Sequence, residues 1–350
     1  MKAIKIIKKG FAAVVEAPIP SLPDETYLLV RTIAVGLNPS DWKHIASVDE
    51  GVVVGCDFAG IVEVVGSKVT KPFKVGDRVA GAVHGSNVLD PQGGAFGDYM
   101  VTKGDLTFKI PDGFSFEEGA AFGVGIVTVG QGLYQEMGLP WPDKPLSEDE
   151  RKSVLIYGGS SASGAFGIQF AKLSGFEVVT TCSPSNFNYV KSLGADKVFD
   201  YKAPNVGAEI REYTKNKLYY AWDCIGGEAL RICSDAVASS APEGQDIVVG
   251  TIVHNTAHPR EDVKYTWSIA YTSQGKDVNL LGRIFPGRPD HFEFTKQWVE
   301  LSEKLLIDGR WKPHRQEVRN GGFEGVLEGL EDLKQGKVSG VKLVYRIREL

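Results

Sequence analysis

The stretch Ser153-Val-Leu-Ile-Tyr-Gly-Gly-Ser-Ser-Ala-Ser-Gly-Ala-Phe-Gly-Ile-Gln-Phe-Ala-Lys172 decides the fold of this chain. It consists of a short apolar run, a glycine turn and an amphipathic segment, which together predict a buried strand followed directly by a helix. A helix that begins near Ser163 presents unpaired N–H groups and the positive end of its dipole to the turn. This arrangement is typical of sites that bind the pyrophosphate of a dinucleotide.

The glycine pattern of this turn is altered at its middle position. Gly159, Ser161 and Gly164 follow the G-x-G-x-x-G spacing, with serine in place of the second glycine. A serine side chain leaves less room for a phosphate beside the backbone than glycine does, but its hydroxyl is able to donate a hydrogen bond to the phosphate. We interpret the turn as an adapted dinucleotide site, while an ordinary strand-turn-helix of an α/β domain is the alternative.

The next predicted strand, over 176–181, indicates which dinucleotide binds. It ends in Thr181-Cys-Ser183, where a site for NAD usually carries an acidic residue on the ribose 2′-hydroxyl. No carboxylate is present there to repel a 2′-phosphate, and Ser183, Asn186 and Lys191 are nearby donors. The pattern therefore favours NADP(H).

Composition limits the class of protein. The chain has 350 residues, 43% of them hydrophobic and 24% charged, so we expect a globular protein of two domains. A net charge of −5 with dispersed lysines and arginines argues against nucleic acid as a partner. Neither a membrane-spanning run nor a signal peptide is evident, which predicts a cytoplasmic protein with no membrane contact. The four cysteines are widely spaced and predict buried, reduced thiols.

Strand and helix patterns divide the chain. The first third contains β-branched runs at 27–35, 60–65, 78–82 and 97–102, and Ser115 with Glu118 forms a capping box at the start of a helix. Proline and charge predict an exposed loop over 138–151. Beyond it, alternating strands and helices predict a parallel sheet with strands at 154–157, 177–181, 197–199, 219–223, 246–250 and 277–282. Helices over 294–307 and 323–334 and a strand over 341–347 form a tail that we assign back to the first domain.

Several further stretches carry a family resemblance. The motifs are Gly36-Leu-Asn-Pro-Ser-Asp-Trp-Lys43, Gly55-Cys-Asp-Phe-Ala-Gly60, Val75-Gly-Asp-Arg-Val79, Gly94-Ala-Phe96 and Ser192-Leu-Gly-Ala-Asp196. They resemble the zinc-free, quinone-reductase-like branch of the medium-chain dehydrogenase/reductase superfamily over essentially the whole chain. Within that branch, Tyr157-Gly-Gly-Ser-Ser-Ala-Ser163 and Thr181-Cys-Ser-Pro-Ser-Asn-Phe187 resemble the trans-acting enoyl reductases of fungal highly reducing polyketide synthases, such as that of lovastatin biosynthesis.

The resemblance implies an α/β fold made of two domains. A GroES-like, β-rich catalytic domain would comprise residues 1–127 and 286–350, and a Rossmann domain with a doubly wound parallel sheet would comprise residues 128–285. NADPH would be the cofactor. The residues that would surround it are Pro39, Ser40, Asp41, Trp42, Lys43, Ser160, Ser161, Ala162, Ser163, Ser183, Asn186, Tyr201, Gly250, Thr251, Ser339 and Gly340. The site for the acyl substrate would be lined by Thr128, Tyr271, Thr272, Ser273, Gln274 and Gly275.

The resemblance also implies a reaction. Asp41 stands at the first position where zinc alcohol dehydrogenases of the superfamily need a metal ligand, so a catalytic zinc is not expected. Without a metal, the suited reaction is conjugate reduction of an enoyl thioester by hydride from NADPH. Lys43, Thr128 or a backbone amide would stabilise the enolate, and Lys43 is the leading proton donor, with a solvated or phosphate-pairing lysine as the alternative.

The implied partners are a polyketide synthase or its acyl carrier protein, and the chain is expected to be a monomer. Residues 278–283 are the candidate edge strand through which ordinary quinone reductases pair. Two other functions stay open. One is a stand-alone quinone or enone reductase for free small molecules. The other is a catalytically silent nucleotide-binding partner of a synthase.

Overall fold

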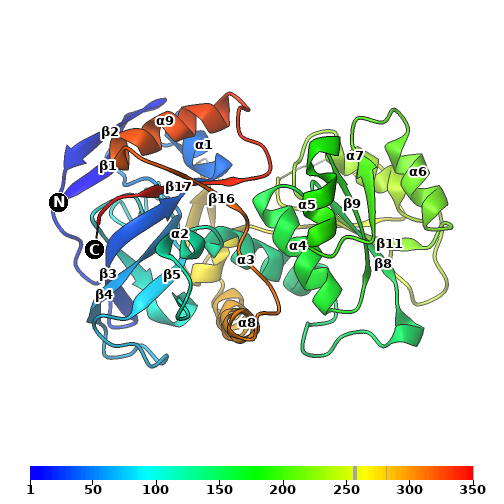
Figure 1. Cartoon of the computed structure of the whole chain (residues 1–350), viewed down its shortest axis with the longest axis horizontal. Coiled ribbons are helices and arrows are strands. Elements are labelled where there is room, and N and C mark those ends of the chain that lie inside the picture. The colour runs from blue at the N-terminus through cyan, green and yellow to red at the C-terminus, as the bar shows by residue number, and fades with distance from the viewer. Residues whose placement is uncertain (255–257, 281, 350) are drawn as a thin grey trace. The chain divides into compact units, whose positions relative to one another are not determined.

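The computed structural model describes residues 1–254, 258–280 and 282–349 and divides the chain into two compact units (Figure 1). The first unit comprises Met1–Val127 and Tyr271–Leu350, and the second comprises Thr128–Ala270. The sequence had suggested a second boundary at 285/286. Residues 271–285 group with the first unit because they pack there: the Tyr271 ring stacks on His84, and the Lys276 ammonium lies 4.7 Å from the Tyr27 ring centroid.

An antiparallel sheet forms the centre of the first unit. Along the sheet the strands run in the order β16-β17-β3-β4-β5-β7, with β6 pairing to β3 and β16 parallel to β17. The four strands predicted in the first third are confirmed as β3, β4, β5 and β6. The bounds are β3 (Tyr27–Gly36), β4 (Asp57–Val65), β5 (Arg78–Ala82), β6 (Tyr99–Lys103), β7 (Phe108–Lys109), β16 (Gln316–Arg319) and β17 (Lys342–Arg346).

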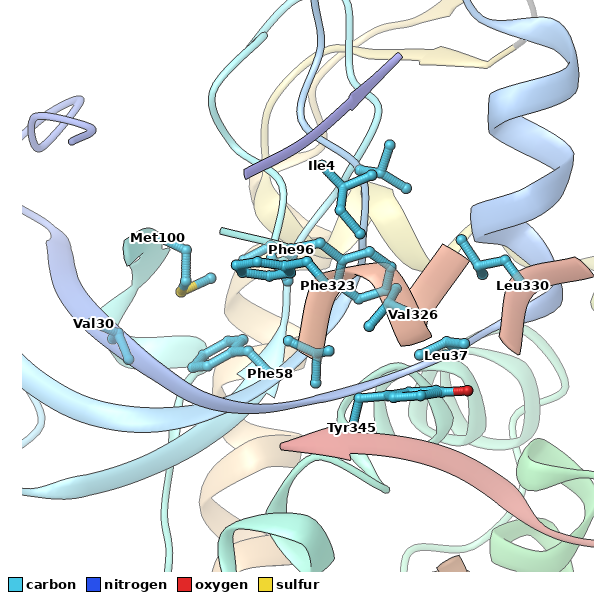
Figure 2. Packing of buried hydrophobic residues seen from close by; sticks show 14 of the residues in the cluster. Ile4, Val30, Leu37, Phe58, Phe96, Met100, Phe323, Val326, Leu330 and Tyr345 are labelled. Atoms are coloured by element: carbon cyan, nitrogen blue, oxygen red, sulfur yellow. The ribbon is translucent and has the colours of Figure 1, made fainter. Parts of the chain in front are cut away.

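The C-terminal tail completes the core of this unit, as the sequence predicts (Figure 2). Helix α9 (Gly322–Lys334) contributes Phe323, Val326 and Leu330, which pack with Phe58 of β4 and Tyr345 of β17. The hairpin of β1 (Lys2–Lys8) and β2 (Phe11–Glu16) contributes apolar side chains to the same cluster. Segments from both ends of the chain therefore share one hydrophobic core.

Helices flank this sheet. One of them, α2, begins with the capping box that the sequence predicts. The Ser115 hydroxyl accepts from the Glu118 amide at 3.1 Å, and the Glu118 carboxylate accepts from the Ser115 amide at 2.8 Å. The Trp298 indole donates to the carbonyl of Ile126 at 2.8 Å, which attaches the long tail helix to α3. The helices are α1 (Pro39–Ser47), η1 (Gly104–Leu106), α2 (Phe116–Gly119), α3 (Gly123–Val129), η5 (Ala270–Gln274) and α8 (Pro289–Ile307).

The second unit contains a parallel sheet in the order β10-β9-β8-β11-β12-β13. Helices connect its strands, and the apolar faces of α6 and α7 pack on it around Leu155, Ala221 and Val249. The strands are β8 (Ser153–Tyr157), β9 (Glu177–Cys182), β10 (Lys197–Asp200), β11 (Leu218–Asp223), β12 (Val248–Thr251) and β13 (Lys264–Trp267). The helices are η2 (Gly130–Glu136), η3 (Glu148–Glu150), α4 (Ala162–Leu173), η4 (Pro184–Asn186), α5 (Phe187–Ser192), α6 (Val206–Tyr213) and α7 (Ala229–Ala236).

Five of the predicted parallel strands are confirmed, but the assignment of 277–282 to this sheet is wrong. The sheet is completed instead by β13, whose four-residue sequence Lys-Tyr-Thr-Trp is too short for its alternation to stand out. Residues Val278–Leu280 form β14, which pairs antiparallel with β15 (Arg283–Phe285) in the first unit. The candidate pairing edge at 278–283 is therefore not an edge of the parallel sheet, and Leu281 lies outside the described residues.

Burial corrects one further expectation and confirms another. The loop over 138–151 is exposed at most positions from 143 to 150, but Leu139 and Pro142 are buried. All four cysteines are buried free thiols, as predicted. Within the described residues, no helix combines the length and apolar character needed to cross a membrane.

Candidate functional site

The carboxyl ends of the parallel strands of the second unit lie in register at one edge of the sheet. Tyr157 of β8 is opposite Thr181 of β9 on one side and Asp223 of β11 on the other, and Asp223 is opposite Thr251 of β12. The strand order reverses between β8 and β11. In open α/β sheets, ligands bind outside the carboxyl ends of the strands at such a reversal.

The turn after β8 brings its backbone close to α4. Gly158 has a φ of +83°, which favours glycine, and the Gly159 amide donates to the carbonyl of Thr181 at 2.9 Å. A Cβ atom on Gly164 would lie 2.2 Å from the Gly158 carbonyl oxygen. Glycine at 158 and 164 therefore allows the helix to begin directly against the turn.

Ser161 caps this helix. Its hydroxyl oxygen accepts from the Gly164 amide at 3.1 Å, which leaves the hydroxyl proton free for another acceptor. Within the described part of the chain, the amides of Ala162 and Ser163 donate to no backbone or side-chain acceptor. Free amides, a serine hydroxyl and a helix N-terminus fit an anion such as the pyrophosphate of a dinucleotide.

The end of β9 carries the groups that the sequence assigned to an adenosine phosphate. The Asn186 amide donates to the Ser183 hydroxyl at 3.1 Å, and the Ser185 hydroxyl lies 3.2 Å from the same oxygen. Tyr201 follows β10, and its side chain is 41% exposed. Ser160–Ser163, Ser183, Asn186 and Tyr201 thus follow three adjacent strands at the same edge.

The sequence interpretation missed two acidic residues at this edge. Asp200 ends β10 opposite Cys182, and burial together with the Asp200 charge raises the pKa of the Cys182 thiol to about 11. Asp223 ends β11 and accepts from the amides of Ile225 and Gly226 and from the Thr251 hydroxyl. Burial raises the pKa of Asp223, and these donors oppose the rise. Both acids come from strands other than the one searched for a ribose-binding carboxylate.

The remaining predicted residues of the second unit lie in packed positions. Gly250 is in β12, where an added Cβ would lie 2.7 Å from the Met137 sulfur. Thr251 is buried at the end of the same strand, and Thr128 is buried near the end of α3. Gly250 is therefore in close contact with Met137, and the side chains of Thr128 and Thr251 are shielded from solvent.

In the first unit, the predicted nicotinamide-bordering residues Pro39 to Lys43 begin helix α1. Asp41 closes a capping box: its Oδ2 accepts from the Asn38 amide at 2.7 Å. Burial raises the pKa of Asp41 to about 7, although the Asn38 amide and the Lys342 charge oppose the rise. Lys43 is exposed, and its ammonium lies 5.7 Å from the centroid of the Trp42 ring. The motif that looked like a binding loop thus also has a structural role at the start of a helix.

A buried ion pair between Lys342 and Asp57 contacts Asn38, the residue before helix α1. Lys342 Nζ lies 2.6 Å from Asp57 Oδ2 and 2.6 Å from Asn38 Oδ1, and both charged side chains are less than 5% exposed. The other Asp57 oxygen accepts from the Val124 amide at 2.6 Å. This network connects β17, β4, α3 and the N-terminus of α1, and sequence reasoning did not identify it.

Ser339 and Gly340 precede β17. Gly340 has a φ of +65°, and its carbonyl accepts from the Arg315 guanidinium. Lys342, two residues further on, contacts Asn38. The structure therefore connects the segment after Gly340 to the start of α1 within the first unit.

A cavity of about 540 Å³ lies in the first unit and contains part of the predicted acyl-binding stretch. Tyr271 and Gln274 line it, whereas Thr272 and Ser273 are buried. The Thr272 hydroxyl lies 2.8 Å from Nδ1 of His291, and Gly275 ends the turn with a φ of +69°. The complete lining consists of Pro23, Tyr27, Val83, His84, Asn87, Leu89, Asp90, Gly93, Val101, Thr102, Tyr271, Gln274, Lys276, Asp277 and Val278.

The inner wall of this cavity is built from aromatic rings. Tyr271 stacks on His84 with ring centroids 3.9 Å apart and planes 11° apart, and the His44 ring centroid lies 5.6 Å from that of Tyr271. The Tyr271 hydroxyl lies 3.8 Å from the Cys56 sulfur. Burial lowers the pKa of His44 to about 4 and that of His84 to about 3, so both rings are neutral at neutral pH.

No metal-ligand spacing connects the six histidines, which predicts for each of them a position at the surface or behind the site. His44, His84, His291 and His314 are all less than 9% exposed, whereas His254 and His258 are exposed. Their burial results from packing between distant segments, which the spacing of histidines along the chain does not reveal. Among the described residues, no group of three or more His, Cys, Asp or Glu side chains is arranged to hold a metal ion.

Comparison with known proteins agrees with this geometry. Residues 24–112 match the alcohol dehydrogenase GroES-like domain, and residues 162–297 match the domain described as zinc-binding dehydrogenase. The fold resembles that of CurK enoyl reductase, with a TM-score of 0.78, 19% identity and coverage of 99% of this chain and 98% of that one. It also resembles the quinone oxidoreductase from Coxiella burnetii, with a TM-score of 0.72, 20% identity and 99% of both chains covered. These likenesses define the medium-chain dehydrogenase/reductase fold.

Curated relatives are much more similar in sequence. The chain is 44% identical to the trans-enoyl reductase resD of Aspergillus sclerotiorum over 99% of this chain and 100% of the relative. It is 42% identical to the trans-enoyl reductase ACTTS2 of Alternaria alternata over 99% and 98% of the two chains. It is 46% identical to the trans-enoyl reductase TOXD of Cochliobolus carbonum over 77% and 89%.

The chain therefore belongs to the trans-enoyl reductase family of the medium-chain dehydrogenase/reductase superfamily. It is an oxidoreductase whose cofactor is a nicotinamide nucleotide. The free amides at the start of α4 fit the pyrophosphate of such a cofactor.

Proposed function

We propose that this protein reduces the α,β-double bond of an enoyl thioester that a polyketide synthase presents on its acyl carrier protein, with NADPH as the reductant. The observation that supports this most strongly is 44% identity to a trans-enoyl reductase along the full length of both chains. The cofactor would supply the hydride. The residues of this chain would hold the cofactor and the thioester, stabilise the enolate and deliver a proton.

The preference for NADPH depends on the donors after β9. Ser183, Ser185 and Asn186 offer hydroxyl and amide groups to a 2′-phosphate, while Asp200 on the neighbouring strand opposes it. The hydroxyl and amide donors would hold a 2′-phosphate by hydrogen bonds, whereas the Asp200 carboxylate would repel it through its charge.

This preference is tested by adding and removing charge. Ser183→Asp is expected to weaken the binding of NADPH at least tenfold relative to that of NADH, and Asp200→Asn is expected to strengthen the binding of NADPH. Ser192→Asp adds the same charge on exposed helix α5 and serves as the matched control. Fluorescence titration with each nucleotide measures the ratio, and an unchanged ratio in Ser183→Asp would remove Ser183 from the 2′-phosphate site.

Lys43, Thr128 or a backbone amide would stabilise the enolate oxygen. Thr128 is buried, so its hydroxyl has a fixed position, whereas Lys43 is exposed and more mobile. Thr128→Val preserves the shape of the side chain and removes the donor. We expect it to lower kcat with a crotonyl thioester by tenfold or more while nucleotide affinity stays the same.

The substrate class is tested with the purified protein. Oxidation of NADPH with crotonyl-pantetheine, and faster oxidation with the same acyl group on a carrier protein, is the expected result. The cavity lining contains Lys276 together with Asp90 and Asp277, so it is not a basic surface in itself. Turnover of simple quinones without turnover of any enoyl thioester would contradict the proposal and favour a stand-alone quinone reductase.

A further inference from the structure

The side chain of Tyr271 connects the open cavity of the first unit to buried polar groups behind it. One face of its ring stacks on His84, which lines the same cavity. Its hydroxyl lies 3.8 Å from the sulfur of Cys56, which is fully buried. Tyr271, a residue that lines a substrate-sized cavity, thus has its O–H group next to a second exchangeable proton.

A carboxyl group lies behind this pair. Asp41 is 1% exposed, and its Oδ1 makes no hydrogen bond among the described residues. The charge of Asp41 raises the pKa of Cys56, after burial, and that of Tyr271 as well, so the three groups lie close together. The Ser40 hydroxyl, on the helix whose start is proposed to border the nicotinamide, also interacts with the Tyr271 hydroxyl.

The surroundings of Tyr271 keep its phenol protonated. Burial raises the pKa of Tyr271 well above its usual value, so the hydroxyl retains its proton at neutral pH. His84 and His44 beside it are neutral, because burial lowers the pKa of each. Lys43, the donor suggested by the resemblance, is exposed and is not among the residues that line the cavity in the described chain.

We propose that Tyr271 is the catalytic proton donor to the α-carbon of the enoyl substrate, an inference that rests on the proposed function. Hydride addition at the β-carbon leaves an enolate. The Tyr271 O–H bond breaks and a C–H bond forms at the α-carbon, which gives the saturated thioester and a phenolate. The phenolate then takes a proton from water in the cavity or from the protonated Asp41–Cys56 pair, so that one hydride and one proton are added overall.

The test separates proton donation from hydride transfer. Tyr271→Phe keeps the ring that stacks on His84 and removes only the hydroxyl, and Tyr99→Phe makes the same change at a tyrosine outside the cavity. With crotonyl-pantetheine we expect Tyr271→Phe to lower kcat about 100-fold or more, as for loss of a general acid. With a nitroalkene we expect a change of less than about fivefold, because the nitronate product leaves as an anion and is protonated in water.

Isotope effects give a second measurement. In Tyr271→Phe with the thioester, the solvent deuterium isotope effect is expected to rise and the effect of deuterated NADPH to fall, because protonation becomes rate-limiting. A variant that only displaced the substrate would show the opposite change. If Tyr271→Phe does not fold, Tyr271→His keeps a planar ring with an N–H donor and is tested with the same two substrates.

Three results would overturn the inference: full activity of Tyr271→Phe with the thioester, equal losses with both substrates, or a loss in Tyr99→Phe as large as that in Tyr271→Phe. A wild-type protein that reduces no enoyl thioester would instead contradict the proposed function. The two failures are therefore distinguishable in one set of assays.

Discussion

The buried pair of Lys342 and Asp57 leads to a prediction about stability. Lys342→Met removes the ammonium and leaves the Asp57 carboxylate, which is 0% exposed, with the side-chain amide of Asn38 and the backbone amide of Val124 as its donors among the described residues. Asp57→Asn leaves the ammonium buried in the same way. An uncompensated buried charge costs about 3–5 kcal/mol, so each single substitution is expected to destabilise the first unit by that amount.

The double variant, Lys342→Met with Asp57→Asn, should lose less free energy of unfolding than either single variant. Once both charges are absent, neither requires a partner, and Asn at 57 still offers an oxygen to the Val124 amide. We expect a loss of about 0–2 kcal/mol, so the coupling energy between the two positions exceeds about 3 kcal/mol. Lys337→Met is the control, because the ion pair of Lys337 and Asp332 lies at the surface, where a salt bridge contributes little to stability.

The assay must report on the first unit alone, because two units need not unfold together. Urea-dependent hydrogen exchange of peptides from β3, β4 and β17 gives that local stability, and calorimetry gives the shift in Tm. For a unit of this size 1 kcal/mol corresponds to about 2–4 °C, so each single variant should lose about 6–20 °C. A Lys342→Met protein within about 1 kcal/mol of the wild type, or additive single losses in the double variant, would refute the reasoning.

Three further predictions concern pH and the nucleotide site. Burial lowers the pKa of His314 to about 3, whereas a histidine in the unfolded chain has a pKa near 6.5, so the free energy of unfolding should fall as pH decreases from 6.5 toward 3. His314→Gln should reduce the slope of that free energy against pH by up to about 1.4 kcal/mol per pH unit, as measured by urea titrations at a series of pH values. Ser161→Ala removes the cap of α4, and we expect a loss of about 1 kcal/mol by urea unfolding together with weaker NADPH binding by titration. Gly164→Ala places a Cβ 2.2 Å from the Gly158 carbonyl and should abolish nucleotide binding by calorimetry, whereas Gly81→Ala has ordinary contacts and should retain it.

Local sequence patterns were sufficient for most of the second unit. The strand, turn and helix over 153–172 have their own signals, namely an apolar run, positive-φ glycine and a serine cap, and all three occur in the structure. The last strand was missed because Lys264–Trp267 is four residues long, so its alternation of polar and aromatic residues is too short to identify a strand. Val278–Leu280 is more apolar and attracted the assignment, although it pairs in another sheet. Tertiary pairing therefore decided between two short segments that propensity could not separate.

The site was predictable where function depends on backbone shape and less so where it depends on distant side chains. Asp200 was overlooked because it ends the strand beside β9, and parallel register brings it to Cys182. Lys342 contacts Asn38 across more than 300 positions of the chain, and no periodicity connects the two. The same holds for His84 and Tyr271, which only the fold brings together.

The two units offer their ligands opposite kinds of chemistry. At the start of α4, free amides and a helix dipole favour a negative charge, which suits a pyrophosphate. Behind the cavity of the first unit, burial holds the His44 and His84 rings neutral and keeps Tyr271 and Cys56 protonated, so these four side chains carry no charge and the last two offer a proton. A wall of this kind suits an uncharged acyl chain that becomes an enolate only during reaction, because a neutral O–H donor stabilises the developing charge and then removes it by proton transfer.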